Sequence, residues 1–367
     1  MIHLYYRPYY NISASFFFKN ILCFLIARRT AIALVIIRNA AMVCQYKFTT
    51  RHAASLAGAT WMFLWVIAAA PVAANTTSLR AAELRTAVGG GQPLLVVASG
   101  NDPANAAQFE RWLERPVDGV QLHNGREDWA DWTGSIGWLI DVWSDQTRPI
   151  FWSIQLLPKN GASLIKGAAG AYDSYYAEAG RLLSNSQPQG PIFVRIGWEF
   201  NGDWMPWAAA GQEKAYVSTY RNLVAQFRLH SNRFVFEWSP NVGDYGMDPG
   251  TAWPGDDVVD IVGIDFYYHP EWNSSDPQAA WDHMVTQPYG LAWHRDFAAA
   301  RGKPRAFSEW GVALDTSGPY VSNAAAWFNQ DDVVYQSYWN SDADFPGKLS
   351  DRRMPLAGAA YREMFGN

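Results

Sequence analysis

Short apolar runs alternate with amphipathic segments along the chain after residue 75. Eight runs have the β-branched and aromatic composition of buried strands. They are Leu94–Ser99, Gly119–His123, Pro149–Leu156, Ile192–Trp198, Phe234–Trp238, Ile261–Asp265, Arg305–Ser308 and Val333–Tyr338. The segments with helical spacing are Ala104–Glu114, Ser135–Ser144, Tyr172–Ser184, Glu213–His230, Gln278–Arg301, Ser322–Gln330 and Pro355–Phe365. Only the connection after Trp238 lacks a helical pattern.

This alternation predicts an α/β fold, a (β/α)8 TIM barrel forming a single catalytic domain over residues 75–367. An open doubly wound sheet is the competing fold. No Gly-x-Gly-x-x-Gly follows any of the strands, so a dinucleotide-binding sheet has no support.

The predicted strand tips carry aromatic residues beside carboxylates or amides. In a barrel the chemistry lies at the C-terminal ends of the strands, so these tips should line the site. Indole faces stack on sugar rings, and 17 of the 19 tryptophans lie after Ala74. The residues placed to contact a sugar are Arg195, Trp198, Trp204, Tyr267, Trp152, Trp310 and Trp339.

Two glutamates stand out as a catalytic pair. Glu199 follows the fourth strand and Glu309 follows the seventh, so a closed barrel brings them to one mouth. Tryptophans around Glu199 should raise its pKa, as a general acid requires. Glu309 would stay ionised if Arg195 and Tyr267 donate hydrogen bonds to it. A carboxyl separation of about 5–5.5 Å would imply retention, and about 6.5–9.5 Å inversion.

The charge balance is uneven along the chain. Residues 1–74 contain seven basic and no acidic residues, so the remainder has 22 basic against 34 acidic residues and a net charge of −12. Such an acidic body argues against nucleic acid or an anionic membrane as partner and is compatible with neutral polysaccharide. Both cysteines, Cys23 and Cys44, precede residue 75. We therefore expect no disulfide and no cysteine-based metal site in the remainder. We also expect a monomer without cofactor or metal.

The first 74 residues have the pattern of a targeting region. The charge-free run from Ala53 to Ala74 follows Arg51 and ends in small residues, which predicts a secretory signal over residues 42–74 and a secreted or periplasmic protein. An uncleaved membrane anchor is the alternative. Residues 1–41 are either a start placed too far upstream, with Met42 the true initiator, or a second hydrophobic segment.

Four motifs occur in order: R-I-G-W-E-F-N-G-D-W-M-P-W from Arg195, F-E-W-S-P-N, V-D-I-V-G-I-D-F-Y and F-S-E-W-G-V. Together they resemble glycoside hydrolase family 26, which holds β-mannanases and related β-xylanases and β-glucanases of the retaining barrel clan. The resemblance implies that Glu199 is the acid/base, Glu309 the nucleophile and Tyr267 its hydrogen-bond donor. It also implies that Trp204 and His123 contact substrate.

One residue departs from that resemblance. The family usually has histidine immediately before the acid/base, and this chain has Trp198. Imidazole can donate and accept a hydrogen bond, whereas indole can only donate, so the sugar at the cleavage point would be bound differently. A secreted retaining endo-β-glycanase acting on β-mannan, β-xylan or β-glucan is the leading interpretation. The alternatives are a glycanase that processes a bacterium's own exopolysaccharide and a carbohydrate-binding barrel without catalysis.

Overall fold

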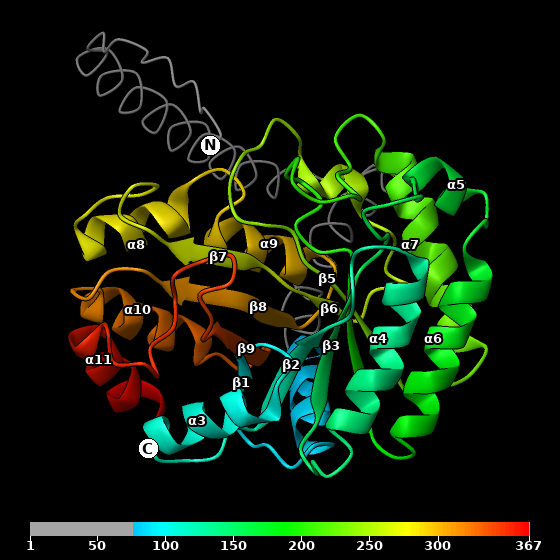
Figure 1. Ribbon diagram of the computed structural model, residues 1–367. Coiled ribbons are helices and arrows are strands. Elements are labelled where there is room, and N and C mark those ends of the chain that lie inside the picture. The colour runs from blue at the N-terminus through cyan, green and yellow to red at the C-terminus, as the bar shows by residue number, and fades with distance from the viewer. Residues whose placement is uncertain (1–75, 367) are drawn as a thin grey trace, which may run out of the picture. The chain divides into compact units, whose positions relative to one another are not determined.

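The computed structural model describes residues 76–366, and within them nine strand segments pair in parallel around a closed barrel. The segments are β1 Leu94–Ala98, β2 Gly119–His123, β3 Ile150–Ile154, β4 Ile192–Ile196, β5 Phe234–Trp238, β6 Ile261–Val262, β7 Asp265–Tyr268, β8 Arg305–Val312 and β9 Val333–Trp339. Figure 1 shows these strands at the centre with helices around them, and β1 lies beside β9, which closes the ring. The predicted (β/α)8 barrel is confirmed.

The segments β6 and β7 are two parts of one strand position. β6 pairs with β5 and β8, and β7 continues along β8. Gly263 lies at the break, and a Cβ atom there would be 2.1 Å from Ser308 Oγ and 2.4 Å from Glu237 Oε1. Glycine therefore lets the strand pass close to these two polar groups.

The helices surround the barrel in the predicted order. They are α3 Pro103–Leu113, α4 Trp129–Val142, α5 Leu164–Ala168, α6 Asp173–Ser186, α7 Glu213–Arg228, α8 Pro277–Thr286, α9 Leu291–Ala300, α10 Gly318–Phe328 and α11 Pro355–Phe365, with a 3₁₀ turn η1 at Pro249–Ala252. The prediction of one helix over Gln278–Arg301 was wrong. Pro288 lies between α8 and α9, where its missing N–H cannot continue the first helix, and Gly290 begins the second.

Successive residues of each strand face opposite ways, and this sorts the apolar residues into two cores. The inward-facing core is the smaller one, and Phe151, Phe193 and Tyr335 stack within it with centroid distances of 4.5 Å. Ala81 and Leu84, from a helical segment over residues 76–86, cover this core at the N-terminal end of the barrel. The larger core lies between the strands and the outer helices.

Two residues further along each strand, the interior becomes polar. Phe193 is followed by Arg195, Val235 by Glu237, and Phe151 by Ser153. Glu237 accepts hydrogen bonds from Ser308 Oγ and from Tyr335 Oη, the latter at 2.5 Å. The barrel therefore holds an apolar plug at its N-terminal end and buried ionisable groups toward its C-terminal end.

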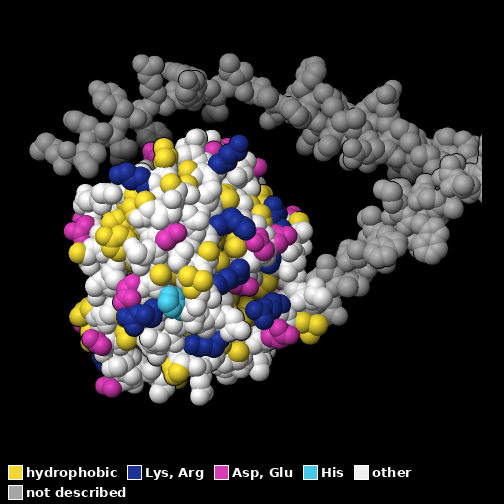
Figure 2. Space-filling model, turned by 90° about the vertical axis from the view of Figure 1, so that its right-hand side faces the viewer, with side chains coloured by type: hydrophobic (Ala, Val, Ile, Leu, Met, Phe, Trp, Pro, Cys, Tyr) yellow, Lys and Arg dark blue, Asp and Glu magenta, His cyan; other side chains and the backbone are white. Residues whose placement is uncertain are grey.

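One face of the molecule carries charges of both signs without a charged patch. Figure 2 shows the face on the side of α5, α6 and α7, where acidic and basic side chains are interspersed rather than gathered into one basic area. Among residues 76–366, no helix combines the length and apolarity that crossing a membrane would require. The expected signal sequence over residues 42–74 lies outside the described residues and stays a prediction.

We predict that Phe193→Ala lowers the free energy of unfolding by about 3–5 kcal/mol, because it leaves a cavity in the inward-facing core. Chemical denaturation followed by circular dichroism measures this loss. Ile165→Ala on α5 is the control, since that side chain is 72% exposed and its loss should cost less than about 0.5 kcal/mol. Equal losses for the two variants would contradict this picture of the interior.

Candidate active site

The chain after β4 follows an unusual path that carries Glu199 into the barrel mouth. Gly197 and Glu199 both have left-handed backbones, with φ of 51° and 52°. A Cβ atom at position 197 would lie 2.9 Å from Leu156 Cβ, so glycine is required there. For a glutamate this conformation is strained, and such strain persists only where the surroundings impose it. Here the Glu199 N–H donates to Ser239 O at 2.9 Å, and Gly202 N–H donates to Glu199 O at 3.1 Å.

Two neutral donors hold the carboxyl group of Glu199. Asn241 Nδ2 donates to one oxygen at 2.6 Å, and Trp204 Nε1 donates to the other at 2.7 Å. Burial and the negative charge of Glu309 raise the pKa of Glu199 to about 7, although both donors act in the opposite direction. At neutral pH, this carboxyl group can therefore carry a proton.

Glu309 has partners of a different kind. Arg195 Nη2 donates to it at 2.9 Å, Tyr267 Oη donates to its other oxygen, and His123 Nε2 lies 3.6 Å away. Burial by itself raises the pKa of Glu309, but the charge of Arg195, the nearby His123 and the hydrogen bond from Tyr267 outweigh it and lower the pKa to about 2. Between about pH 2 and pH 7, Glu309 is therefore ionised while Glu199 is protonated.

Arg195 joins the acidic groups beneath the cleft. Its Nη1 donates to Asp265 Oδ1 at 3.1 Å, and its guanidinium lies 4.7 Å from the ring centroid of Trp198. Burial opposes its charge, but Asp265, Glu309 and Glu237 outweigh burial and raise the pKa of Arg195. Burial raises the pKa of Asp265 well above its usual value. The guanidinium is thus the positive charge that this group of carboxyls shares.

The two glutamates face one cleft of about 880 Å³ at the C-terminal ends of the strands. One carboxylate oxygen from each of Glu199, Asp265 and Glu309 lies within 4.8 Å of the others. Loops that follow strands from all around the barrel line this cleft. Glu309 lies within β8 rather than beyond it, and a register shift between Phe307 and Trp310 allows both Ser308 and Glu309 to face the interior.

Most of the predicted site residues come together here. Of the residues predicted for the site, those that line the cleft are Glu199, Glu309, His123, Trp198, Trp204, Tyr267 and Trp339. His123 packs edge-on against Trp198 and Trp339 at centroid distances of 5.3 and 5.9 Å. Trp198 lies against the buried Arg195 and forms part of the cleft wall that also holds both glutamates.

Three residues expected to contact substrate do not line the cleft. Trp152 is one residue out of phase with the inward-facing Phe151 and Ser153, so it packs in the outer core. Trp310 is also buried in that core, where its Nε1 donates to Gln336. Arg195 is buried and absent from the cleft lining, and its guanidinium is paired with Glu309. Neither Trp152 nor Trp310 lines the cleft.

The residues that line the cleft but were not predicted from the sequence include Asn241, Tyr245, Trp272 and Phe345. Asn241 could have been found as an amide at the tip of the fifth strand. Tyr245 stands edge-on to Trp204 at 4.9 Å, and its hydroxyl donates to Asn241 at 3.4 Å. It lies in a loop of Gly, Pro and Asp with no periodic pattern, so only tertiary structure reveals its position.

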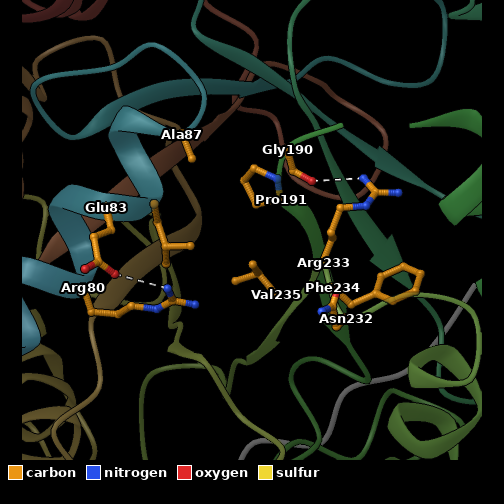
Figure 3. A pocket seen from close by; sticks show the side chains of 10 residues that line it. Arg80, Glu83, Ala87, Gly190, Pro191, Asn232, Arg233, Phe234 and Val235 are labelled. Carbon is orange, nitrogen blue, oxygen red and sulfur yellow. Dashed lines mark hydrogen bonds and ion pairs between the residues drawn. The ribbon is translucent and has the colours of Figure 1, made fainter. Parts of the chain in front are cut away.

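A second hollow, of about 380 Å³, lies at the opposite ends of β4 and β5. Figure 3 shows Arg80 paired with Glu83 on one wall and Arg233 donating to Gly190 O on the other. Its lining contains no pair of buried carboxyl groups. The chemistry therefore belongs to the cleft at the C-terminal ends of the strands.

The parallel barrel and its two opposed glutamates are those of the barrel glycoside hydrolases. The chain belongs to glycosyl hydrolase family 26, whose model matches residues 137–333.

Two curated relatives share part of the chain. Endoglucanase H of Acetivibrio thermocellus is 28% identical over 230 residues, which cover 56% of this chain and 23% of that protein. Mannan endo-1,4-beta-mannosidase A and B of Caldalkalibacillus mannanilyticus is 30% identical over 131 residues, covering 33% of this chain and 22% of that protein. The matched segments thus span less than a quarter of either relative.

Solved structures share the fold at low sequence identity. The catalytic domain of the GH26 endo-beta-1,4-mannanase of Bacillus sp. JAMB-750 superposes with a TM-score of 0.59 at 15% identity, covering 80% of this chain and 90% of that one. A double mutant of the Cellulomonas fimi endo-beta-1,4-mannanase gives a TM-score of 0.55 at 18% identity, with 78% and 75% coverage.

We predict that Gly202→Ala moves Trp204 away from Glu199 and raises the pKa of Glu199 above about 7. The new methyl group would lie 2.2 Å from the indole ring, and the lost hydrogen bond is one that lowers this pKa. Trp204→Phe should raise the pKa in the same direction without altering the backbone. Infrared difference spectroscopy of the carboxyl band against pH measures the change.

Gly134→Ala is the matched control, because its added methyl group on α4 meets no atom within 4 Å. It should leave the titration of Glu199 unchanged. A Glu199 pKa that is the same in Gly202→Ala, Trp204→Phe and the unaltered protein would show that the Trp204 bond does not tune this carboxyl group.

Proposed function

We propose that this protein is a retaining endo-β-glycanase that hydrolyses β-glycosidic bonds within a polysaccharide. The observation that carries the proposal is that two adjacent glutamates have opposite protonation states. Glu199, held by neutral donors, has its pKa raised to about 7, whereas Glu309, held by a cation, has its pKa lowered to about 2. Two carboxyl groups whose environments separate their pKa values in this way are suited to acid and nucleophile roles.

The spacing supports double displacement with retention. Oxygens of Glu199 and Glu309 approach within 4.8 Å, which leaves no room for a water molecule between a base and the sugar. In the first step a Glu309 oxygen bonds to the anomeric carbon while Glu199 gives its proton to the departing glycosidic oxygen. In the second step Glu199 takes a proton from water, whose oxygen replaces Glu309 on that carbon.

Other groups of the chain support these steps. Arg195 and Tyr267 keep Glu309 ionised, and their hydrogen bonds to its two oxygens fix the orientation of the carboxylate. Trp204 holds Glu199 and remains 45% exposed, which leaves one indole face available to a sugar ring. A carbohydrate-binding barrel without catalysis would not need carboxyl groups poised in opposite states.

The substrate belongs to the β-mannan, β-xylan or β-glucan type. One curated relative is named an endoglucanase and the other a mannan endo-1,4-beta-mannosidase, so backbones of both kinds are candidates. The resembled family usually has histidine at the position of Trp198, and imidazole both donates and accepts a hydrogen bond whereas indole only donates. A sugar beside the catalytic pair would therefore be bound with fewer hydrogen bonds at that wall. We also propose export of the protein by the segment over residues 42–74.

Release of reducing ends from a panel of β-mannan, β-xylan and mixed-linkage β-glucan tests the function. We expect one polymer to give a mixture of oligosaccharide lengths, and Glu309→Gln to give none. A protein that binds one of these polymers and releases no reducing ends would instead be a binding barrel. Release of single sugars or disaccharides alone would contradict endo action.

The two glutamates should differ in how azide rescues their alanine variants. We predict that Glu199→Ala loses about 10²–10⁴-fold in rate on substrates with poor leaving groups, the usual share of general acid catalysis. Azide should restore turnover on activated substrates, because it attacks the glycosyl–Glu309 ester without a base and gives a β-glycosyl azide. Rescue of Glu309→Ala should give the inverted α-glycosyl azide. Proton NMR of the anomeric signals distinguishes the two, and the same configuration from both variants would contradict the assignment.

The pH dependence should follow the same two groups. We predict that kcat/KM falls as the pH rises through about 7, because Glu199 then loses the proton it must donate. It should fall at the acidic end only as the pH approaches about 2, where Glu309 becomes protonated. Initial rates on a soluble substrate measure the profile, with circular dichroism at each pH as the control for folding. A decline of kcat/KM with rising pH that is already complete well below pH 7, in folded enzyme, would contradict the role of Glu199.

A further inference from the structure

Trp272 is an exposed aromatic residue that the catalytic steps do not use. It lies in the turn after β7, where its N–H donates to His269 O at 3.0 Å. Its side chain is 63% exposed, and it lines the same cleft as the two glutamates. The His269 ring supports the indole from one side, with a centroid distance of 4.7 Å and an interplanar angle of 30°.

A buried ring connects Trp272 to the catalytic groups. Phe345, from the loop after β9, contacts Trp272 at 5.9 Å and Tyr267 at 4.4 Å between centroids. Tyr267 in turn donates its hydroxyl hydrogen to Glu309. The centroids of Trp272 and Tyr267 are therefore at most 10.3 Å apart.

Two glycines give Phe345 a fixed place in this row. A Cβ atom at Gly311 would lie 3.1 Å from the Phe345 ring, and one at Gly347 would lie 2.9 Å from it. The ring is only 4% exposed, so it cannot rotate freely into the cleft. Tyr267, Phe345 and Trp272 therefore form an aromatic row that leads from the nucleophile to the rim, and the row is held before any ligand binds.

We propose that Trp272 is the stacking platform of a remote subsite, which binds a neutral pyranose unit of the polymer away from the bond that is cleaved. Leaving an indole exposed is unfavourable, and covering it with the apolar face of a sugar removes that surface from water. Asp344 and Ser341, from the same loop as Phe345, also line the cleft and offer polar groups to the hydroxyls. The inference rests on the proposed function, since the polymer that binds here is the substrate.

Exposure alone does not distinguish Trp272. Trp138 is 53% exposed, yet it lies on the outer helix α4 and does not line the cleft. Trp272 differs because it faces the cleft and continues a row of rings from Glu309. Tyr267 and Phe345 lie between Glu309 and Trp272 in this row, so we assign the stacked sugar to a unit beyond the one whose anomeric carbon reacts. The subsite should therefore make binding and turnover depend on chain length.

The test measures binding by isothermal titration calorimetry in a Glu309→Gln background. The probes are β-1,4-linked manno-, xylo- and cello-oligosaccharides from disaccharide to hexasaccharide. Trp272→Ala should weaken binding of the longest ligands about tenfold, as expected for the loss of one aromatic stacking contact, and leave disaccharide binding unchanged. Trp272→Phe should recover part of the loss, and the control Trp138→Ala should bind as the parent does.

Each other outcome has a definite meaning. Equal affinity of Trp272→Ala and its parent for every length would overturn the remote subsite, as would an equal loss at every length. If the Trp272→Ala enzyme hydrolyses the polymer, and its binding of oligosaccharides depends on their length as in the parent, the subsite is refuted and the proposed function is left intact. Length-dependent binding that requires Trp272, in an enzyme that releases no reducing ends from the polymer panel, would keep the subsite and refute the proposed function.

Discussion

The buried guanidinium of Arg195 is the interaction on which the rest of the site depends. Burying a charge is costly unless it is paired, and Arg195 is paired with Asp265 and Glu309 at 3.1 and 2.9 Å. Its attraction keeps Glu309 ionised in a place where burial acts to raise the pKa of that carboxyl group. The resulting negative charge then acts on Glu199 and helps keep that group protonated. One cation thus separates the states of two chemically identical side chains.

The strand period places this cation. Along β4, Phe193 faces the apolar plug, and Arg195 faces the polar layer two residues later. The same alternation puts Glu237 in the interior and Trp152 outside. Packing of the apolar plug holds the strands in place, and the strands position the charged groups nearer the C-terminal end of the barrel. Stability and chemistry are therefore carried by alternate residues of the same short segments.

This period also explains how far the sequence could predict the molecule. The eight apolar runs predict the barrel because their length and spacing are local properties. Glu199 and Glu309 were predictable because a carboxylate at a strand tip has little structural use. Trp152 could not be placed correctly without knowing which residues face inward, and a buried tryptophan looks the same in sequence as an exposed one. Trp272 lies in a turn without a period, so its approach to Phe345, 73 residues later, becomes visible only in the folded chain.

The most direct test of the central claim is a titration of the two carboxyl groups themselves. Carbon-13 NMR of enzyme labelled at the glutamate carboxyl carbons follows each group, and Glu199→Gln and Glu309→Gln identify the two signals. The account predicts that Glu199 loses its proton near pH 7 and that Glu309 stays ionised down to about pH 2. Replacing Arg195 by Met should raise the pKa of Glu309. Titration of Glu309 at a higher pH than Glu199 in the unaltered protein would contradict the account.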